Sequence, residues 1–422
     1  MSPDVENKED AEAVMDLSNP DITTKYHSAA DIVNLTMSAL IPLCIPGADI
    51  CTLCKKGDAF IENEASKIFN KKEKGKKGCF YPPFSFMEGE MDWICPSCVE
   101  VEKGIAFPTC VSVNEICANF SPLEGESSTL KAGDLVKVDL GCHIDGFISM
   151  GAHSFIIGED PSFFTGRRAD VLKAAHVTAE AALRVVKVGN KNTDVTKIIE
   201  KAAHEYGCAP VAGSFSHEMK HHLIEGSRTI PNKESHEEKV EEFEFGPNEV
   251  YSLDILVSSG DGKVKESDIR TTVFKRAVET NYTLKSQLAR TFISEVNKRF
   301  PLLPFTIRAV ETQKACRMGV SEAMRHELLS PYSVMTDKGG EFVAHFKYTV
   351  LLLPGGTKKI TGLPFTQKDK LLSSYEITDE EIKKLLASSL HSKKKKKKSK
   401  SAIPANETEK EYADVEMHAD DE

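Results

Sequence analysis

The sequence has no apolar run near the ~18 residues that a membrane-spanning helix needs. Its longest apolar stretches, 40–44 and 348–354, have the length of a strand or a short helical segment. It also lacks a secretory signal, because the first twenty residues carry six acidic residues and one lysine, whereas a signal peptide needs a basic end and an apolar centre. These absences predict a protein of the cytosol or nucleus with no membrane partner.

A disulfide framework is also missing. The eleven cysteines are an odd number, are thinly spread and belong to a chain without an export signal, so we expect them to be reduced. Two C-x-x-C pairs, Cys51 with Cys54 and Cys95 with Cys98, leave a four-cysteine zinc site open. Unliganded thiols are the favoured interpretation, because only the second pair, with Pro and Ser between its cysteines, looks like a knuckle turn.

Charge is distributed unevenly along the 422 residues, whose net charge is −10. The first twenty residues hold half of it, and residues 391–422 are neutral with eight lysines and eight acids, which leaves −5 for residues 21–390. Blocks of like charge bury nothing, so we predict disordered ends at 1–20 and 391–422. The mildly acidic body does not suggest nucleic-acid binding by its overall charge, so any such affinity must come from local patches.

Helical and strand patterns alternate through the body. We expect the predicted helix at 194–206 to begin at a cap formed by Thr193 or Asp194. Thr378 and Glu381 have the spacing of a capping box before a short last helix. Apolar spacing predicts the earlier helices at 21–43, 168–186 and 194–206.

One strand pattern occurs twice. D-L-V-K-V-D-L at 134–140 and E-V-Y-S-L-D-I at 249–255 are both short strands with an Asp near the end, followed by glycines. Alternate residues of a strand share a face, so the two strands can present Asp139 and Asp254 at matching positions. A chance match is the alternative interpretation of this internal echo.

These residues lie within segments that resemble the methionine aminopeptidase ("pita-bread") family. The shared segments are G-I-A-F-P-T at 104–109, V-S-V-N at 111–114, F-S-P-L at 120–123, V-D-L-G-C-H-I-D-G-F at 138–147 and F-S-H at 215–217. Further segments resemble its non-peptidase branch, the proliferation-associated (ErbB-receptor-binding) proteins: S-H-E-M-K-H-H at 216–222, V-S-S-G-D-G at 257–262, F-I-S-E-V-N-K-R-F at 292–300, L-P-F-T-I-R at 303–308 and H-F-K-Y-T-V-L-L-L-P at 345–354.

The resemblance covers about residues 15–400 and implies a fold class. It implies an α+β pita-bread fold with two pseudo-symmetric halves, which agrees with the internal echo. The folded domain then spans 21–390, with an atypical insertion loop at 79–103 and a helical insertion at 277–338.

The resemblance also implies where the peptidases of this superfamily hold two divalent metals. Their first Asp, His and first Glu fall on Asp139, His217 and Asp254, the last a shorter carboxylate. Their second Asp and last Glu fall on Met150 and Lys347. A soft thioether replaces a hard oxygen ligand, and a cation at ~4 Å from a bound ion costs a few kcal/mol, so we expect a degenerate site with no metal cofactor and no catalytic residue.

Two further expectations concern this degenerate metal site. A substrate-facing His of the peptidases falls on Asn119 and is therefore lost. The Lys347 ammonium is expected to occupy the old metal position and to pair with Asp139 or Asp254, which would compensate these buried charges. Polar core residues kept by descent remain the plainer interpretation of Asp139, His217 and Asp254.

Two lysine clusters are candidate RNA-binding segments, since lysine runs contact phosphates through counterion release without reading bases. A solvated charged segment or a nuclear-import signal is the alternative interpretation. The clusters are Lys71, Lys72, Lys74, Lys76 and Lys77, and Lys393, Lys394, Lys395, Lys396, Lys397 and Lys398.

The sequence therefore predicts a non-catalytic aminopeptidase-fold protein. The resemblance implies that it binds ribosomes, ribosomal RNA and ribonucleoprotein particles, with roles in ribosome biogenesis, translation and growth regulation. It also implies cytoplasmic and nuclear pools, including the nucleolus, and possible transcriptional or receptor protein partners. Two alternatives stay open: an active metal-dependent methionine aminopeptidase, and a DNA-binding or transcriptional co-regulator adapter.

Overall fold

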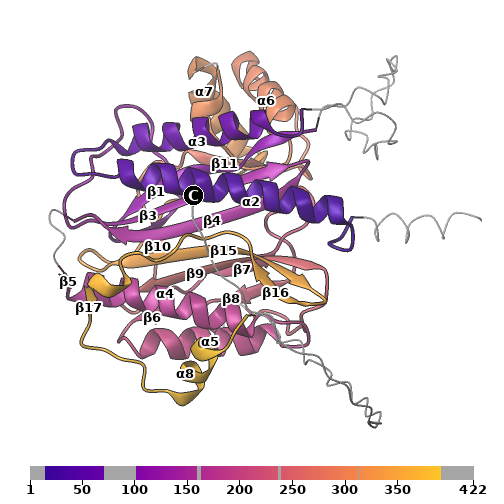
Figure 1. Ribbon diagram of the computed structural model, residues 1–422. Coiled ribbons are helices and arrows are strands. Elements are labelled where there is room, and N and C mark those ends of the chain that lie inside the picture. The colour runs from indigo at the N-terminus through magenta and orange to yellow at the C-terminus, as the bar shows by residue number, and fades with distance from the viewer. Residues whose placement is uncertain (1–14, 71–100, 159–162, 236–238, 312, 391–422) are drawn as a thin grey trace, which may run out of the picture. The chain divides into compact units, whose positions relative to one another are not determined.

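The computed structural model describes residues 15–70, 101–158, 163–235, 239–311 and 313–390 (Figure 1). All of them belong to the compact unit Met1–His391. No helix in these ranges is long and apolar enough to span a bilayer.

A nine-stranded sheet forms the centre of this unit (Figure 1). Its main path is β1-β3-β4-β15-β9-β7-β8, with β16 paired to β15 and β6 to β9, and every pairing is antiparallel. The strands are β1 Lys103–Val113, β3 Leu135–Ile144, β4 Phe147–Ile156, β6 Ala209–Pro210, β7 Phe215–Glu218, β8 Thr229–Pro231, β9 Glu249–Ser258, β15 Val343–Leu353 and β16 Gly356–Lys359.

Three smaller sheets border the central one, in the orders β10-β14-β2, β12-β11-β13 and β17-β5. Their strands are β2 Ile116–Ala118, β5 Phe164–Thr165, β10 Lys265–Glu266, β11 Val273–Arg276, β12 Phe305–Thr306, β13 Leu329–Pro331, β14 Met335–Thr336 and β17 Leu371–Leu372.

The helices are α2 Pro20–Leu40, α3 Ile50–Lys67, α4 Arg167–Val185, α5 Asn192–His204, α6 Gln287–Arg299, α7 Gln313–Arg325 and α8 Glu380–Ala387. Short 3₁₀ turns lie at Ile41–Leu43, Ile307–Ala309 and Lys368–Lys370.

Four helices cover one face of the central sheet, with α2 and α3 in front of one half and α4 and α5 in front of the other (Figure 1). The α2 and α3 pair buries the even-numbered side chains of β3, such as Val136 and Val138. The α4 and α5 pair buries the odd-numbered side chains of β9, such as Leu253 and Ile255. Because side chains alternate along a strand, Asp139 and Asp254 point to the opposite, helix-free face in both halves.

The two halves repeat one chain order, which is the structural origin of the internal echo. Helices α2 and α3 precede β1, β3 and β4, and helices α4 and α5 precede β7, β9 and β15. The halves meet where β4 pairs with β15 through Ala152 with Lys347 and Gly151 with Tyr348. The predicted strands at 134–140 and 249–255 are confirmed: β3 includes 135–140 and β9 includes 249–255.

The predicted helical insertion at 277–338 contains α6 and α7, but also β12, β13 and β14. The two helices have their own small core, centred on Phe292, Val296 and Phe305. Arg276 fastens the insertion by donating to the backbone carbonyls of Leu328 and Thr280, each at 3.0 Å.

Three local predictions were wrong in their details. The first helix ends at Leu40 and passes into a 3₁₀ turn that has Pro42 near its start. Helix α5 begins at Asn192 rather than at a Thr193 or Asp194 cap, since the Asn192 side chain donates to Thr229 O and Glu241 O.

The last helix is capped by Asp379, which accepts from the amides of Glu381 and Ile382. Thr378 does not form the predicted capping box, because its hydroxyl donates to the Glu205 carboxylate at 2.8 Å.

The boundary at residue 20 also moves. Leu17 is buried and packs with Ile22 and Tyr26, so the folded region begins before residue 21. Residues 1–14, most of the predicted insertion loop at 79–103 and the tail at 391–422 lie outside the described residues, and the predictions for them stay predictions.

Candidate functional site

Three charged side chains and one alanine form a row across the central sheet. Asp139 pairs with Ala152 on β4, Ala152 pairs with Lys347 on β15, and Lys347 pairs with Asp254 on β9. Directly paired residues in antiparallel strands point to the same face. The register therefore brings Asp139, Lys347 and Asp254 together on the helix-free face.

The Lys347 ammonium lies between the two carboxylates. Its Nζ is 2.7 Å from Asp139 Oδ2 and 3.0 Å from Asp254 Oδ2. Lys347 is 6% exposed and Asp139 is 4% exposed, so this pair is shielded from bulk water, whereas the side chain of Asp254 is 19% exposed. The expected pairing of Lys347 with one of the aspartates is confirmed, and the lysine in fact contacts both.

The electrostatics of this triad depend on mutual compensation. Burial alone would lower the pKa of Lys347, but Asp139 and Asp254 outweigh it and hold the pKa above its usual value. Burial alone would raise the pKa of Asp254, but Lys347 and His345 hold it well below the usual range. The ammonium and the Asp254 carboxylate therefore both stay charged at neutral pH.

His345 is a site residue that the sequence did not single out. Its Nε2 lies 2.5 Å from Asp254 Oδ1, and the residue is 1% exposed. Its position in the sequence could have identified it, because it lies two residues before Lys347 on the same strand and both side chains therefore point to one face.

His217 lies beside the triad on β7. It pairs with Ser252, which shares a face of β9 with Asp254. Burial lowers the pKa of His217, so its imidazole is neutral at pH 7. Among the described residues, three buried polar atoms here have no hydrogen-bond partner: His217 Nδ1, Asp139 Oδ1 and His345 Nδ1.

Met150 is part of an apolar cluster and not of the charged row. It is 2% exposed, lies two residues before Ala152 on β4 and belongs to the same buried cluster as Phe107 and Val250. Phe107 also lies against the charged row, since the Lys347 ammonium is 5.6 Å from its ring centroid. A Cβ on Gly141 would lie 3.2 Å from Met150 Cγ, so the cluster is closely packed.

Asn119 stabilises the local backbone through its conformation and one side-chain hydrogen bond. Its backbone has a φ of 66°, a conformation that asparagine tolerates better than most residues. Its side-chain amide donates to the backbone carbonyl of Ser333 at 3.0 Å. The residue thereby joins the end of β2 to the segment after β13.

A pair of divalent metals does not fit this arrangement. One oxygen of each carboxylate is paired with the Lys347 ammonium, which lies between the two carboxylates. The thioether of Met150 is a poor ligand for a hard cation. In the part of the chain that the structure describes, no three His, Cys, Asp or Glu side chains are arranged to hold a metal ion.

The other predicted sites have separate outcomes. Cys51 and Cys54 are free thiols buried in α3. Cys95, Cys98 and both lysine clusters lie outside the described residues, so the zinc and RNA-binding predictions for them stay predictions.

Comparison with known proteins places this fold in a family. Residues 24–269 match the model of metallopeptidase family M24. The chain is 40% identical to ErbB-3 binding protein 1 of Arabidopsis thaliana over 414 residues, which cover 97% of each chain. It is 37% identical to a curved DNA-binding protein of Schizosaccharomyces pombe over 397 residues, which cover 93% of this chain and 96% of that one.

A solved structure agrees over nearly the whole body. The structure of a thermophilic Arx1 superposes with a TM-score of 0.77 at 27% identity, covering 89% of this chain and 100% of that one. The predicted pita-bread fold is thereby confirmed. The chain belongs to the ErbB-3-binding (proliferation-associated) protein family, within metallopeptidase family M24.

Proposed function

We propose that this protein is a non-catalytic member of the M24 superfamily that works by binding. The observation that carries the proposal is the Lys347 ammonium, 2.7 Å and 3.0 Å from the two carboxylates that a metallopeptidase would use as ligands. Hydrolysis in this superfamily needs a metal-activated water, and a cation covalently tethered at that position opposes metal binding.

We further propose that its partners are ribosomal particles and structured RNA. The similarity to a curved DNA-binding protein supports nucleic-acid affinity in general, and the name of the Arabidopsis relative supports a receptor protein as a second kind of partner. This proposal carries with it roles in ribosome biogenesis, translation and growth regulation, and cytoplasmic and nuclear pools that include the nucleolus.

Helices α6 and α7, within the insertion 277–338, carry a basic surface that no sequence motif indicated. Residues 277–338 hold nine Lys or Arg and six Asp or Glu, a net charge of +3 on a body that is otherwise acidic. Four of the basic residues on α6 and α7 are exposed and make no ion pair with another described residue: Arg290, Lys298, Arg317 and Arg325.

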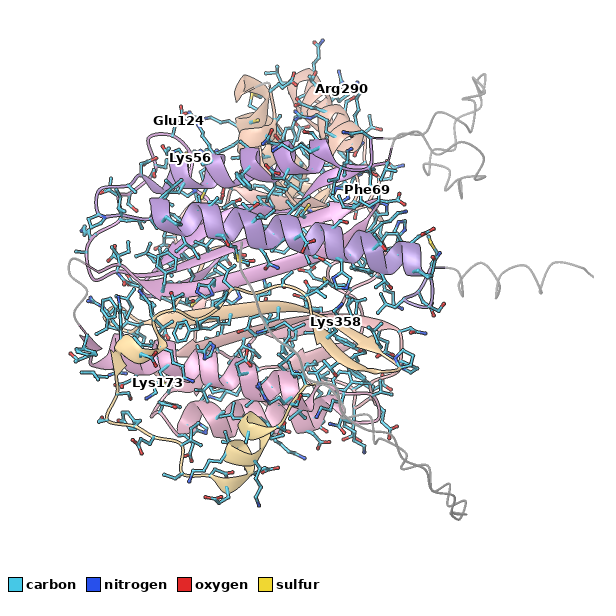
Figure 2. All side chains as sticks on the ribbon, in the orientation of Figure 1. Lys56, Phe69, Glu124, Lys173, Arg290 and Lys358 are labelled. Carbon is cyan, nitrogen blue, oxygen red and sulfur yellow. The ribbon has the colours of Figure 1, made fainter. Side chains whose placement is uncertain are left out.

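This insertion surface is suited to phosphate contact. Arg290 projects from α6 at the top of the view in Figure 2, and its guanidinium also donates to the carbonyls of Leu284 and Lys285 at 3.0 and 2.7 Å. Exposed arginines and lysines on short helices bind phosphates without reading bases, so recognition of RNA by shape is the expected mode.

Sedimentation on ribosome gradients tests the proposal. We expect the native protein to sediment with ribosomal particles at low salt, and an Arg290→Glu/Arg325→Glu variant to bind about tenfold or more weakly, since each lost phosphate contact removes counterion release. Lys197→Glu/Lys239→Glu, the same charge change at exposed lysines outside the insertion, should bind as the native protein does. Absence of the native protein from all ribosomal fractions at low salt would count against the proposal.

The alternatives give different results in simple assays. An active aminopeptidase would release N-terminal Met from a peptide in added cobalt or manganese, and metal analysis would find two tightly held ions per chain. A DNA-binding adapter would prefer duplex DNA to structured RNA when both are titrated against salt. On α8, Ile382, Leu385 and Leu386 have the spacing of a helical protein-contact motif. They give the adapter no support, because Ile382 is fully buried and the two leucines pack against the same core cluster.

A further inference from the structure

A second cluster of titratable groups, one buried and two partly buried, lies apart from the Lys347 triad. The rings of His221 and His222 have centroids 4.3 Å apart, and His143 lies 6.4 Å from His222. His143 is on β3 next to the tight turn into β4, whereas His221 and His222 are in the loop 219–228 between β7 and β8. The three imidazoles therefore join two segments that are far apart in the sequence.

Close packing makes this contact specific. The His222 amide donates to Gly146 O at 2.8 Å, and His221 Nε2 lies 2.8 Å from Asp145 O. A Cβ on Gly146 would come within 2.4 Å of His222 Nε2, so only glycine fits beneath the ring. His221 also packs on Phe147 with centroids 4.7 Å apart. The loop 219–228 is fastened to the β3–β4 turn mainly by imidazole rings.

The surroundings favour neutral imidazoles. Burial lowers the pKa of all three histidines, that of His143 to about 4, and the neighbouring rings lower the pKa of His143 and His221 further. Three other charged groups face the cluster: Asp145 on the turn, Lys25 on α2 and Glu102 before β1.

Those carboxylates cannot balance three added protons. Asp145 is already paired with Lys25, and burial raises the pKa of Glu102, so it begins to lose its charge when acid is added. Two carboxylates and one ammonium give the cluster a charge of −1 with neutral rings and +2 with all three rings protonated. Protonation would therefore place like charges at ring-contact distance.

We propose that His143, His221 and His222 form an acid-sensitive latch that holds the loop 219–228 against the β3–β4 turn at neutral pH and releases it when the rings are protonated. A metal site is the less suitable interpretation, because no three such side chains in the described ranges are arranged around an ion.

Release of the loop 219–228 would affect the surroundings of the Lys347 site. The same loop contains Gly226, whose amide donates to Glu218 O at 2.9 Å, and Glu225, which acts electrostatically on both His217 and Tyr332. Opening of the latch would therefore expose the helix-free face beside His217. The latch makes access to this part of the helix-free face dependent on pH.

The sign of the effect follows from linkage. The closed latch binds protons more weakly than the open one, because burial depresses the pKa of its histidines below the ordinary value of ~6.5. The closed form is therefore fully favoured above that pH and is lost as the pH falls. The opening constant should rise about tenfold for each histidine and each pH unit below 6.5, until the depressed pKa is reached.

Hydrogen exchange on the full-length protein tests the proposal. After correction for intrinsic exchange rates, protection in peptides from 141–148 and 219–228 should fall at least tenfold between pH 7 and pH 5.5. In His221→Gln/His222→Asn this fall should be about tenfold smaller or absent. Gln keeps a donor for Asp145 O, and Asn suits the positive φ of 56° at residue 222.

A matched control uses a partly buried histidine outside the cluster. His176→Gln on α4 removes a residue whose pKa is also lowered to about 4, and it should leave the local fall in protection unchanged. Equal protection at both pH values in the native protein would overturn the proposal, as would an unchanged pH response in the double variant.

A direct titration covers the case in which the double variant is already open at pH 7. Imidazole resonances of the native protein should give a pKa below 6.5 for each of His143, His221 and His222, and values of 6.5 or higher would overturn the proposal.

Discussion

At the scale of single residues, Lys347 decides what the helix-free face can do. A buried ion pair has a large desolvation cost, which is offset only when the geometry is good and the charges are balanced. Here one ammonium serves two carboxylates at 2.7 and 3.0 Å, and His345 supports the second carboxylate at 2.5 Å. Removing the single cation would therefore leave two buried anions facing each other.

We predict that Lys347→Met lowers the free energy of unfolding by about 3–5 kcal/mol at pH 7, because breaking one side of a buried pair leaves uncompensated charge. Adding Asp139→Asn to Lys347→Met should recover part of this loss, since it removes one of the orphaned charges. Urea denaturation at pH 7 measures both variants.

Lys56→Met is the control for this prediction, because Lys56 is exposed on α3 (Figure 2) and makes no comparable contact. It should change the free energy of unfolding by no more than about 0.5 kcal/mol. If Lys347→Met were as stable as Lys56→Met, the triad would not be the compensated charge cluster described above.

Much of this triad could be predicted, and the reason is periodicity. The repeated strand pattern gave Asp139 and Asp254 the same register, and the family resemblance placed Lys347 opposite them. His345 was missed because a histidine on a buried strand carries no motif of its own. The cluster of His143, His221 and His222 was missed for another reason: its rings meet across about 80 residues of sequence, which local patterns do not reveal.

At the scale of elements, the contact of α3 with β1 depends on a glycine. Gly57 lies inside α3, where glycine normally costs about 1 kcal/mol relative to alanine. A Cβ at this position would lie 2.5 Å from Thr109 Oγ1 and 2.7 Å from Thr109 Cγ2 on β1, and Thr109 is fully buried. Close approach of helix and strand therefore outweighs helix propensity here.

We predict that Gly57→Ala destabilises the protein by about 1–3 kcal/mol, the usual effect of overpacking, although propensity alone would predict stabilisation. Gly57→Ala/Thr109→Ala should be more stable than the sum of the two single changes predicts, because the second truncation makes room for the new methyl group. A double-mutant cycle from urea denaturation measures the coupling, and additive single changes would show that the two residues are not in conflict.

Helix ends show where sequence patterns reach their limit. The existence and type of α2, α4, α5 and α8 were predicted, but the caps were not. Asn192 and Thr378 both bind groups from distant segments, namely Thr229 O and the Glu205 carboxylate, in place of local amides. A capping pattern read from neighbouring residues cannot account for such tertiary competitors.

At the scale of the whole described body, the duplicated arrangement explains how the fold accommodates a lysine between Asp139 and Asp254. Each half buries its own helices against its own strands, and the helix-free face needs only a balanced charge set at its centre. The proposed binding function depends on exposed surfaces, and these were the least predictable part. The basic insertion surface became visible only when α6 and α7 were placed, because its four cations are separated in the sequence by acidic residues.

The buried His153 and the partly buried His176 should contribute strongly to the acid sensitivity of global stability. His176 on α4 stacks on Phe365 with ring centroids 4.3 Å apart. His153 on β4 packs edge-on to Phe346 with centroids 5.4 Å apart. Burial lowers the pKa of both histidines to about 4. Their contribution to stability is therefore complete above the unfolded-state pKa of ~6.5 and is lost as the pH falls from there toward 4.

We predict that the free energy of unfolding falls by up to about 1.4 kcal/mol per pH unit for each such histidine between pH 6.5 and 4.5. His176→Gln should be less stable than the native protein at pH 7.5, but its stability should decline less steeply with acid, so that the difference narrows toward pH 4.5. Urea denaturation at four pH values between 7.5 and 4.5 gives both slopes. His204→Gln, at an exposed position on α5, should leave the slope unchanged, and an equal slope in His176→Gln would show that this imidazole takes up its proton in the folded protein as readily as in the unfolded chain.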